Sequence, residues 1–237
     1  LGRRTLGLGY AIALSDLALA PGTPSNTARS GGTIFPIVRQ IPPLYGSEPG
    51  PTAGRIGSYV MWTAFASTAV TSSMFITALV PNAAALALAR QSMGVDMSWT
   101  RFTLGFAPAG VLLLMLVPLL AYLLLRPSVR EGAQTVEWAR HELAVMGPVS
   151  RREWTMAALV LAAIALWVTG SNPRIALPLL GSEFIHPTGV VLLIAAAMLL
   201  LRVVSWDDIV ADREAWSVFL YFAMVLTLAD GLNRTGF

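Results

Sequence analysis

Long stretches without a single charged residue constrain this chain more than any other feature. They are 56–89, 102–125, 154–173, 184–201 and 215–229. A helix needs about 20 mostly apolar residues to cross the hydrocarbon core of a bilayer. The chain has 237 residues, of which 55% are hydrophobic and 12% charged, well below the charged share of a typical soluble domain. The sequence therefore predicts an all-α polytopic membrane protein, and it excludes a soluble enzyme and a disordered chain.

The composition argues against several classes of site and activity. The absence of Cys excludes disulfides, a thiol nucleophile and a Cys-ligated metal, and the presence of just two His argues against a His-based metal site. All 16 basic residues are Arg, the net charge is +3, and no basic run is interleaved with aromatic residues. Nucleic-acid binding is therefore not expected. Because the HExxH, GxSxG and Walker A motifs are also missing, we expect neither an enzyme nor a metal or cofactor site.

Arginine residues concentrate between 126 and 153, the longest polar segment of the chain. Because Arg is retained on the cytoplasmic side of a membrane, we place this segment inside the cell as a linker. The other expected segments are spans at 56–89, 102–125, 154–172, 187–204 and 215–230, with an outside loop at 173–186. This arrangement gives about five transmembrane helices.

Two regions do not follow the pattern of a simple span. In 5–43, an apolar arm (5–20) meets a Pro- and Gly-rich tip (21–32), and a second apolar arm (33–41) ends at two prolines. Neither arm is comfortably long enough to span, so we predict a re-entrant helical hairpin, whose tip must lie in protein or a watery cavity. The stretch 56–89 is too long for one straight helix and contains Pro81, so we expect a helix that breaks around 71–82 and resumes.

The tip of the predicted hairpin carries Ser25-Asn26-Thr27, which supplies two hydroxyls and an amide. A second half-helix begins there, so free backbone N–H groups and a positive dipole end favour a carboxylate. Exposed carbonyl groups at the tip could instead hold a small cation, as broken helices do in transporters. Taken alone, the tripeptide is also an ordinary helix N-cap. Its place between two short apolar arms favours the ligand site.

Several stretches resemble the divalent anion–sodium symporter superfamily, and most closely its 2-oxoglutarate/malate translocators and citrate/succinate exchangers. They are APGTPSNTARSGGTI at 20–34, GSEP at 46–49, TSSMFITA at 71–78 with Asn82, SWDD at 205–208 and LADGLNRTGF at 228–237. The resemblance implies an inverted-repeat carrier with the Ser-Asn-Thr motif on two hairpins. This chain contains the first motif alone and does not begin with Met, so we expect a fragment holding the first half and part of the second.

The resemblance also implies a division of the chain and an assembly. The expected parts are a re-entrant hairpin with a cytoplasmic loop (1–54), a broken transmembrane helix with the following helix (55–125), the cytoplasmic linker (126–153), and the start of the second repeat with three transmembrane helices (154–237). A homodimer is implied, in which a scaffold stays fixed in the lipid bilayer while a transport domain carries the hairpins across.

For the site, the resemblance implies that Ser25, Asn26 and Thr27 bind a substrate carboxylate. Sodium-coupled members also bind sodium between the first hairpin and the helix break, and the matching residues here are Ser72, Ser73, Thr77 and Asn82. The translocator branch exchanges dicarboxylates without sodium, so no cofactor is expected unless the carrier is a symporter.

Two charged residues of the hairpin, Asp16 and Arg29, are candidates for a role. For Asp16 the alternatives are binding of a proton or cation and an ion pair that steadies the hairpin. We hypothesise that Arg29 joins the substrate-binding residues and supplies the positive charge that sodium supplies elsewhere, because a charge inside a membrane is costly enough to suggest a task. The alternatives are that Arg29 pairs with Asp16 or extends to the edge of the cavity. Further along the chain, Asp207-Asp208 is expected to cap a helix, and Asp230, followed by Gly231, is expected to mark a helix end.

These observations predict secondary active transport of di- or tricarboxylates of the 2-oxoglutarate, malate, succinate or citrate type, by antiport. One alternative is a sodium-coupled dicarboxylate symporter. A second is a membrane-embedded enzyme or receptor that uses the same cavity. The expected location is the bacterial inner membrane, as an integral multi-pass protein. Which carboxylate is carried is left open, because the second hairpin would contribute to the pocket.

Overall fold

Two clusters of buried apolar side chains hold the N-terminal helices together. The computed structural model describes residues 3–95, 97–131, 133–170 and 187–235. One cluster includes Leu8, Ile12, Tyr59 and Val60, and the other includes Ala20, Met74, Phe75 and Leu114. Both clusters combine residues from the predicted hairpin, the broken helix and the following span, so these three segments pack as one unit.

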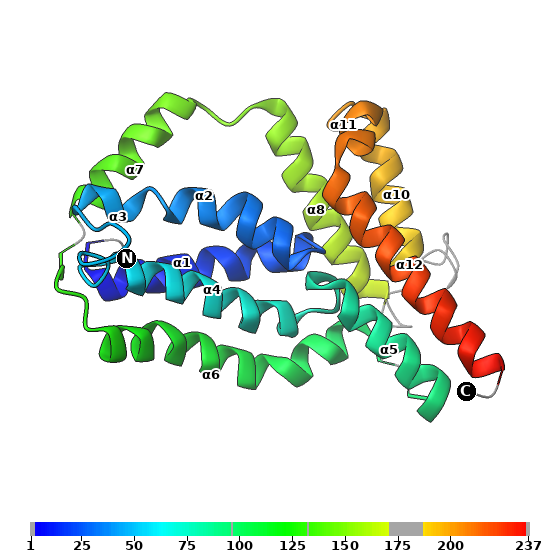
Figure 1. Cartoon of the computed structure of the whole chain (residues 1–237). Helices are drawn as coiled ribbons and strands as arrows, with labels where there is room; N and C mark the ends of the chain where they lie inside the picture. The colour runs from blue at the N-terminus through cyan, green and yellow to red at the C-terminus, as the bar shows by residue number, and fades with distance from the viewer. Residues whose placement is uncertain (1–2, 96, 132, 171–186, 236–237) are drawn as a thin grey trace.

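The hairpin forms with two helical arms, which run side by side in opposite directions (Figure 1). The first arm is α1 (Thr5–Leu19), extended by the 3₁₀ turn η1 (Ala20–Gly22). The second arm contains the π-helix η2 (Ala28–Ile34) and α2 (Phe35–Val38), and the short helix α3 (Ile41–Leu44) follows it.

The expectation that neither arm is long enough to span is wrong for the first arm. Residues Thr5–Gly22 form 18 continuous helical residues with a mean hydropathy of 1.2, which is sufficient by length and composition. The arm is longer than expected because Pro21 falls in the first turn of η1, where the missing N–H of a proline does little harm. The re-entrant placement of the hairpin stays a prediction.

The predicted helix break is confirmed. Helix α4 (Gly57–Met74) ends before an extended Phe75, a single 3₁₀ turn η3 (Ile76–Ala78) follows, and α5 (Val80–Met93) resumes the chain. Pro81 occupies the first turn of α5, where proline suits a helix start. The interruption therefore lies a few residues before Pro81, inside the expected interval 71–82.

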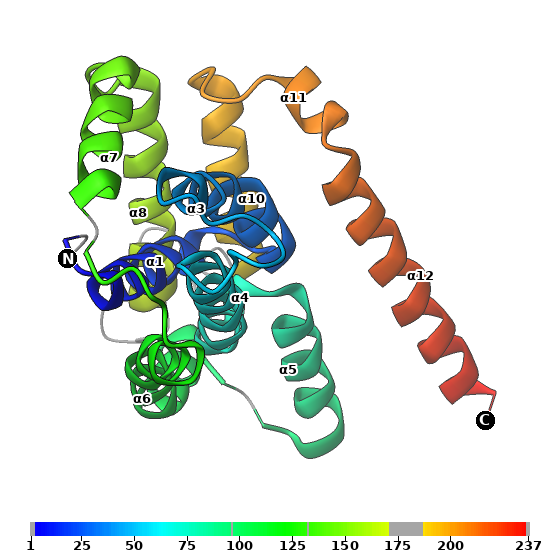
Figure 2. The same ribbon diagram turned by 60° about the vertical axis from the view of Figure 1, so that its left-hand side comes forward.

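Helix α6 (Trp99–Leu125) forms the predicted span at 102–125 and continues through Pro108 and Pro118. It packs along α4, which in turn packs along α1, and Figure 2 shows α6 and α4 nearly end-on. The linker contains α7 (Ala133–Met146). Residues near the start of the linker form hydrogen bonds with the two ends of the hairpin segment. Thr5 Oγ1 donates to the carbonyl of Val129 (2.6 Å), and the hydroxyls of Tyr45 and Thr135 lie 2.9 Å apart.

The C-terminal part contains α8 (Arg151–Gly170), α10 (Pro187–Leu200), α11 (Trp206–Ala211) and α12 (Arg213–Arg234). The predicted outside loop 173–186 lies outside the described residues. Two predicted ends are wrong. Helix α10 ends at Leu200 instead of 204, and α12 continues past Asp230 to Arg234, because one glycine in a helix costs about 1 kcal/mol and does not force an end.

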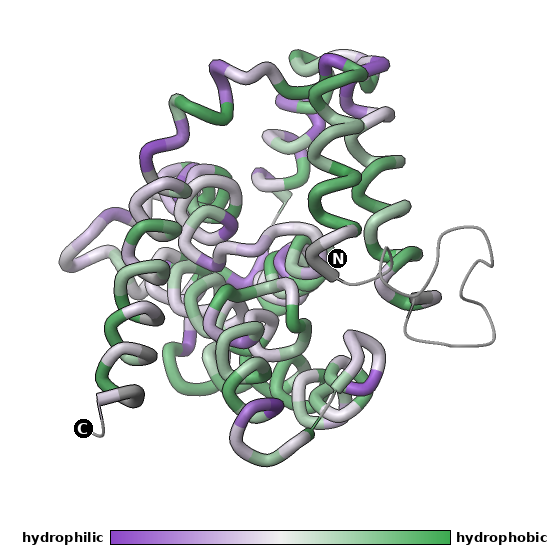
Figure 3. The backbone as a smooth tube through the Cα atoms, turned by 90° about the vertical axis from the view of Figure 1, so that its right-hand side faces the viewer, coloured by the Kyte–Doolittle hydropathy of each residue, from purple (hydrophilic) through white to green (hydrophobic). Residues whose placement is uncertain are grey.

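Three described segments are long and apolar enough to cross a membrane: Thr5–Gly22, Trp99–Leu125 and Arg151–Thr169. Helices α10 and α12 contain shorter apolar segments, and hydrophobic residues dominate much of the helical tube in Figure 3. Every regular element among the described residues is helical, apart from an isolated bridge between Arg4 and Glu131. The structure thus agrees with an all-α membrane protein, while the division into four parts stays a prediction.

Candidate functional site

Ser25 caps the second arm of the hairpin. Its hydroxyl oxygen accepts a hydrogen bond from the backbone N–H of Ala28 (3.1 Å), and its carbonyl accepts one from the N–H of Arg29 (3.0 Å). These are the bonds expected of an N-cap residue. The helical backbone begins at Asn26, so the Ser-Asn-Thr tripeptide lies at the start of this half-helix, as predicted.

The side chains of Asn26 and Thr27 have no hydrogen-bond partner within the described part of the chain. Asn26 is half-buried and Thr27 is exposed. The first N–H groups of a helix also have no partner in the helix itself. An amide, a hydroxyl and free backbone donors therefore lie together at a positive helix end, which suits an anion.

The half-helix that follows is widened into a π-helix over Ala28–Ile34. π-Helical turns are uncommon and are often found at functional sites. A Cβ added at Gly31 or Gly32 would meet no atom within 4 Å among the described residues, so this side of the half-helix is open. The opposite side carries Arg29, which is completely buried.

Arg29 forms an ion pair with Asp16 of the first arm. Its Nε lies 3.0 Å from Asp16 Oδ1, and both side chains are fully buried. Asp16 also accepts hydrogen bonds from the hydroxyls of Thr68 (3.2 Å to Oδ1) and Thr71 (to Oδ2) of α4. A buried ion pair needs such additional bonds to offset the loss of water. The structure therefore shows the pairing that we considered as an alternative role for Arg29.

The other guanidinium nitrogens of Arg29 reach the tip and the break. Nη1 donates to the carbonyl oxygens of Thr23 (3.3 Å) and Ala78 (3.4 Å). Nη2 donates to the hydroxyls of Ser72 (2.8 Å) and Thr71 (3.3 Å) at the end of α4. All three nitrogens of the side chain thus bond within the protein, and together they connect α1, the tip, α4 and the break.

Asn82 stabilises the broken helix from its far side. Its amide nitrogen donates to the carbonyl oxygens of Ser72 (2.7 Å) and Phe75 (3.0 Å). The last carbonyl groups of a helix have no partner in the helix, and their burial is unfavourable unless another donor reaches them. Asn82 supplies that donor, so the break keeps a defined shape.

Thr77 connects the break to the tip. Its hydroxyl donates to the carbonyl of Pro21 (2.8 Å) and accepts from the indole N–H of Trp99 (3.2 Å). The Trp99 ring stacks on Phe75 at a centroid distance of 5.8 Å. The first residue of α6 thereby holds the turn η3 against the hairpin.

Sequence comparison identifies the protein family of this chain. Residues 1–237 match the family described as the sodium:sulfate symporter transmembrane region. The chain belongs to the sodium:sulfate symporter family. This membership confirms the resemblance to divalent anion–sodium symporters, and with it the all-α, multi-pass membrane protein.

Several curated bacterial relatives of this sodium:sulfate symporter family member are 44% identical to it. They include the L-tartrate/succinate antiporters of Shigella sonnei (strain Ss046) and Escherichia coli (strain K12), and the citrate/succinate antiporter of Escherichia coli (strain K12). Each comparison covers 100% of this chain and 47% of the relative, so the chain spans about half the length of the curated relatives it matches. The relatives are transporters by name, and their bacterial origin agrees with the inner membrane.

In this family member, the structure places several of the residues expected at the site close to the hairpin tip. Arg29, Ser72 and Thr77 lie at the contact between tip and break, and Asn82 supports the break from its far side. Ser73 does not join them, because it is exposed and its hydroxyl donates to the carbonyl of Ala69 (3.3 Å) within its own helix. The sequence did not reveal the contacts of Thr68 and Trp99, since neither belongs to a recognisable motif.

Proposed function

We propose that this chain carries a substrate-binding hairpin of a secondary carrier that exchanges di- or tricarboxylates across the bacterial inner membrane. The substrates are expected among succinate, malate, 2-oxoglutarate, citrate and tartrate, since the matched relatives are named for tartrate, citrate and succinate. The proposal is supported by the open, unpartnered donors at the hairpin tip and by the family membership.

In this proposal, the substrate carboxylate binds to the Asn26 amide, the Thr27 hydroxyl and the first N–H groups of the second arm. Ser25 shares in the binding through its remaining hydrogen-bonding capacity, because its oxygen already caps the helix. The position of the tip supports a site away from the membrane surface. A Cβ added at Gly22 would lie 2.8 Å from Val160, which is near the middle of the membrane-spanning α8.

One observation favours exchange without sodium. The guanidinium of Arg29 already bonds to Ser72 and Thr71 and to the carbonyl of Ala78, which are oxygen ligands that a sodium ion at the break would need. The fixed positive charge of the guanidinium therefore lies at the contact between tip and break. Direct contact of Arg29 with substrate stays a prediction, and its observed bonds support the positioning of the tip.

Sodium-coupled symport is the second candidate, because the family description names sodium-coupled members. In that case Ser72, Thr77 and Asn82 would supply oxygen atoms to sodium. The guanidinium of Arg29, which bonds to Ser72 Oγ, would first have to withdraw, whereas Asn82 bonds here through its amide nitrogen and its oxygen stays available. For either mechanism, we propose alternating access by a homodimer, in which the hairpin moves with α4 and α6, the helices on which it packs.

The test is a transport assay with the full-length carrier in liposomes. Labelled succinate uptake is measured with and without internal succinate, and with sodium or choline as the external cation. Exchange predicts uptake that requires internal dicarboxylate and does not change when sodium is replaced. Uptake into empty vesicles that follows a sodium gradient would establish symport instead. Absence of flux for every tested carboxylate would reject the carrier for this substrate class.

A further inference from the structure

Two arginine side chains from different helices border one cavity at a membrane face. Helices α8 and α10 pack against each other and run in opposite directions, so the start of α8 and the end of α10 lie together (Figure 1). A cavity of about 570 Å³ opens between them, lined by Arg152, Arg202, Ser205, Trp206 and Asp208, among others. This end of α8 is the one that the arginine pattern places on the cytoplasmic side.

Both arginines are exposed, and neither forms an ion pair within 4 Å with another described residue. The carboxylate of Asp208, the acidic group of the cavity, accepts hydrogen bonds from Ser205 N (2.9 Å) and Ser205 Oγ (2.7 Å). These bonds, and to a lesser degree the charge of Arg152, hold the pKa of Asp208 below its usual value. The cavity therefore contains two cations and one hydrogen-bonded carboxylate.

The backbone of Arg202 adds an independent observation. Arg202 follows the end of α10 with a φ of 53°, in the left-handed region where a helix end usually places glycine. Its N–H bonds to the carbonyl of Leu199 (3.1 Å), and the N–H of Val203 bonds to that of Met198 (2.9 Å). A side chain in this conformation strains the backbone, and such strain is typical of functional positions.

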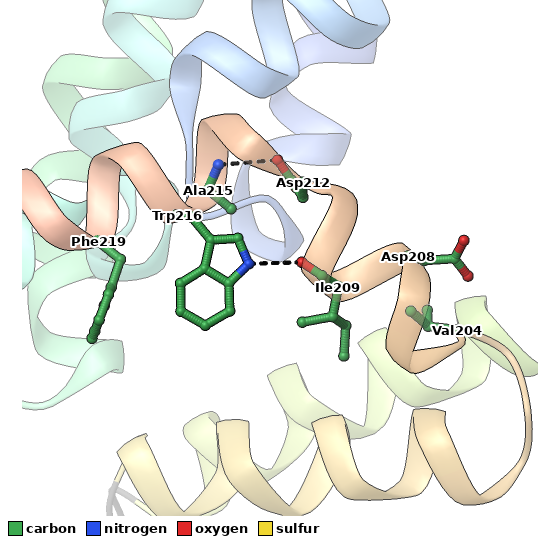
Figure 4. A pocket seen from close by; sticks show the side chains of 7 residues that line it. All are labelled: Val204, Asp208, Ile209, Asp212, Ala215, Trp216 and Phe219. Carbon is green, nitrogen blue, oxygen red and sulfur yellow. Dashed lines mark hydrogen bonds between the residues drawn. The ribbon is translucent and has the colours of Figure 1, made fainter.

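An apolar groove continues from the cavity. It has a volume of about 590 Å³ and shares Val204 and Asp208 with the cavity. Figure 4 shows Ile209, Trp216 and Phe219 along it, with the Trp216 indole donating to the carbonyl of Ile209 (2.9 Å). The carboxylate of Asp212 also lines the groove and accepts a hydrogen bond from the backbone N–H of Ala215 (3.0 Å). The site thus joins a cationic end to an apolar channel between α11 and α12, and Trp206 is exposed beside it, as an interfacial tryptophan would be.

We propose that this cavity and groove bind one anionic phospholipid, with its phosphate between Arg152 and Arg202 and an acyl chain along Ile209, Trp216 and Phe219. Basic pockets at the cytoplasmic side of membrane helices bind anionic headgroups in this way. The site is separate from the hairpin tip. The tip contacts α8 at Val160, eight residues from Arg152, which is about 12 Å along a helix.

The experiment measures lipid binding to the purified full-length carrier by native mass spectrometry. Phosphatidylglycerol and phosphatidylcholine with the same acyl chains are titrated separately. We expect phosphatidylglycerol to bind more tightly, and Arg152→Gln and Arg202→Gly each to weaken it roughly fivefold, which corresponds to about 1 kcal/mol per basic residue. Arg202→Gly also relieves the backbone strain, so its loss of binding cannot be attributed to unfolding.

The matched control is Arg126→Gly. Arg126 has the same left-handed backbone (φ 45°) at the end of α6, on the same expected membrane face, but its guanidinium bonds to Leu123 outside the cavity. This variant should bind phosphatidylglycerol as the unmodified carrier does. Equal binding of phosphatidylcholine, unchanged binding by the Arg152→Gln/Arg202→Gly double variant, or displacement of the lipid by inorganic phosphate or succinate would each overturn the proposal. The last result would assign the site to a free anion.

Discussion

The Nε atom of Arg29 lies 3.0 Å from Oδ1 of Asp16, and neither side chain is exposed. The two residues belong to opposite arms of the hairpin, and their pairing leaves no net charge in the interior. Since Arg29 also bonds to α4 and to the break, a single side chain links the tip to the helices that support it. Loss of one member alone would therefore leave an unpaired charge buried in the hairpin.

Removal of one member of the pair should be far more harmful than removal of both. Arg29→Met leaves a buried, unpaired Asp16 and should destabilise the carrier by about 3–5 kcal/mol, whereas Asp16→Leu/Arg29→Met leaves no charge and should cost much less. Thermal unfolding of the purified full-length carrier measures the difference. Arg39→Met, at an exposed arginine of the same hairpin, is the control and should change stability by less than about 0.5 kcal/mol. Equal losses for the single and the double variant would contradict a buried ion pair.

Asn82→Ala should loosen the helix break. The variant removes the donor that satisfies the carbonyl groups of Ser72 and Phe75, and an unsatisfied buried polar group costs about 1–3 kcal/mol. We expect a lower unfolding temperature together with weaker dicarboxylate affinity, measured by the concentration dependence of exchange. Ser73→Ala is the matched control, because Ser73 is exposed and bonds within its own helix. If both variants behaved alike, the bonds of Asn82 would not determine the shape of the break.

Gly9→Ala should disrupt the contact between α1 and α4. An added Cβ would lie 1.9 Å from the hydroxyl oxygen and 2.7 Å from Cζ of the buried Tyr59, so the Tyr59 side chain or one of the helices must shift. Overpacking of this kind typically costs about 1–3 kcal/mol. Gly105→Ala in α6 is the control, since its Cβ would meet no described atom within 4 Å and alanine favours a helix over glycine. Gly9→Ala should therefore lower the unfolding temperature of the carrier, and Gly105→Ala should raise it.

The general plan of the molecule could be predicted from local patterns. The uncharged stretches located the helices, and the polar residues near Pro81 located the break, because both effects act within a few turns of helix. The length of the first arm was underestimated, since a proline in the first turn of a 3₁₀ segment does not end a helix. Likewise, Gly231 did not end α12, because helix propensity is weaker than the sum of the neighbouring helical bonds.

The supporting contacts of the site were harder to predict. Asp16 and Arg29 are 13 residues apart, and a pairing across a hairpin depends on where the chain turns. Thr68 and Trp99 contribute through a hydroxyl and an indole N–H that reach Asp16 and Thr77 from other helices. No spacing along the chain encodes these distances. The tip motif was recognisable because its three residues are consecutive, whereas its support comes from four separate segments.

The tip itself offers a test that separates binding from folding. Ser25 caps the second arm, so Ser25→Ala should lower the stability of the carrier by about 1 kcal/mol as well as its affinity for dicarboxylate. Thr27 is exposed and has no partner among the described residues, so Thr27→Val should leave the unfolding temperature unchanged. Its effect should be confined to transport, because it removes one donor to the carboxylate and, with it, about 0.5–1.5 kcal/mol of binding.

The two variants are compared with Thr27→Ser, which keeps the hydroxyl and should retain both stability and affinity. Thermal unfolding and succinate exchange are measured on the same preparations of the full-length carrier. Normal exchange by Thr27→Val would show that Thr27 does not bind the substrate. The role of the tripeptide would then be the helix cap that Ser25 provides. Loss of exchange at an unchanged unfolding temperature would support direct action of the hydroxyl on the substrate, since the described fold makes no use of it.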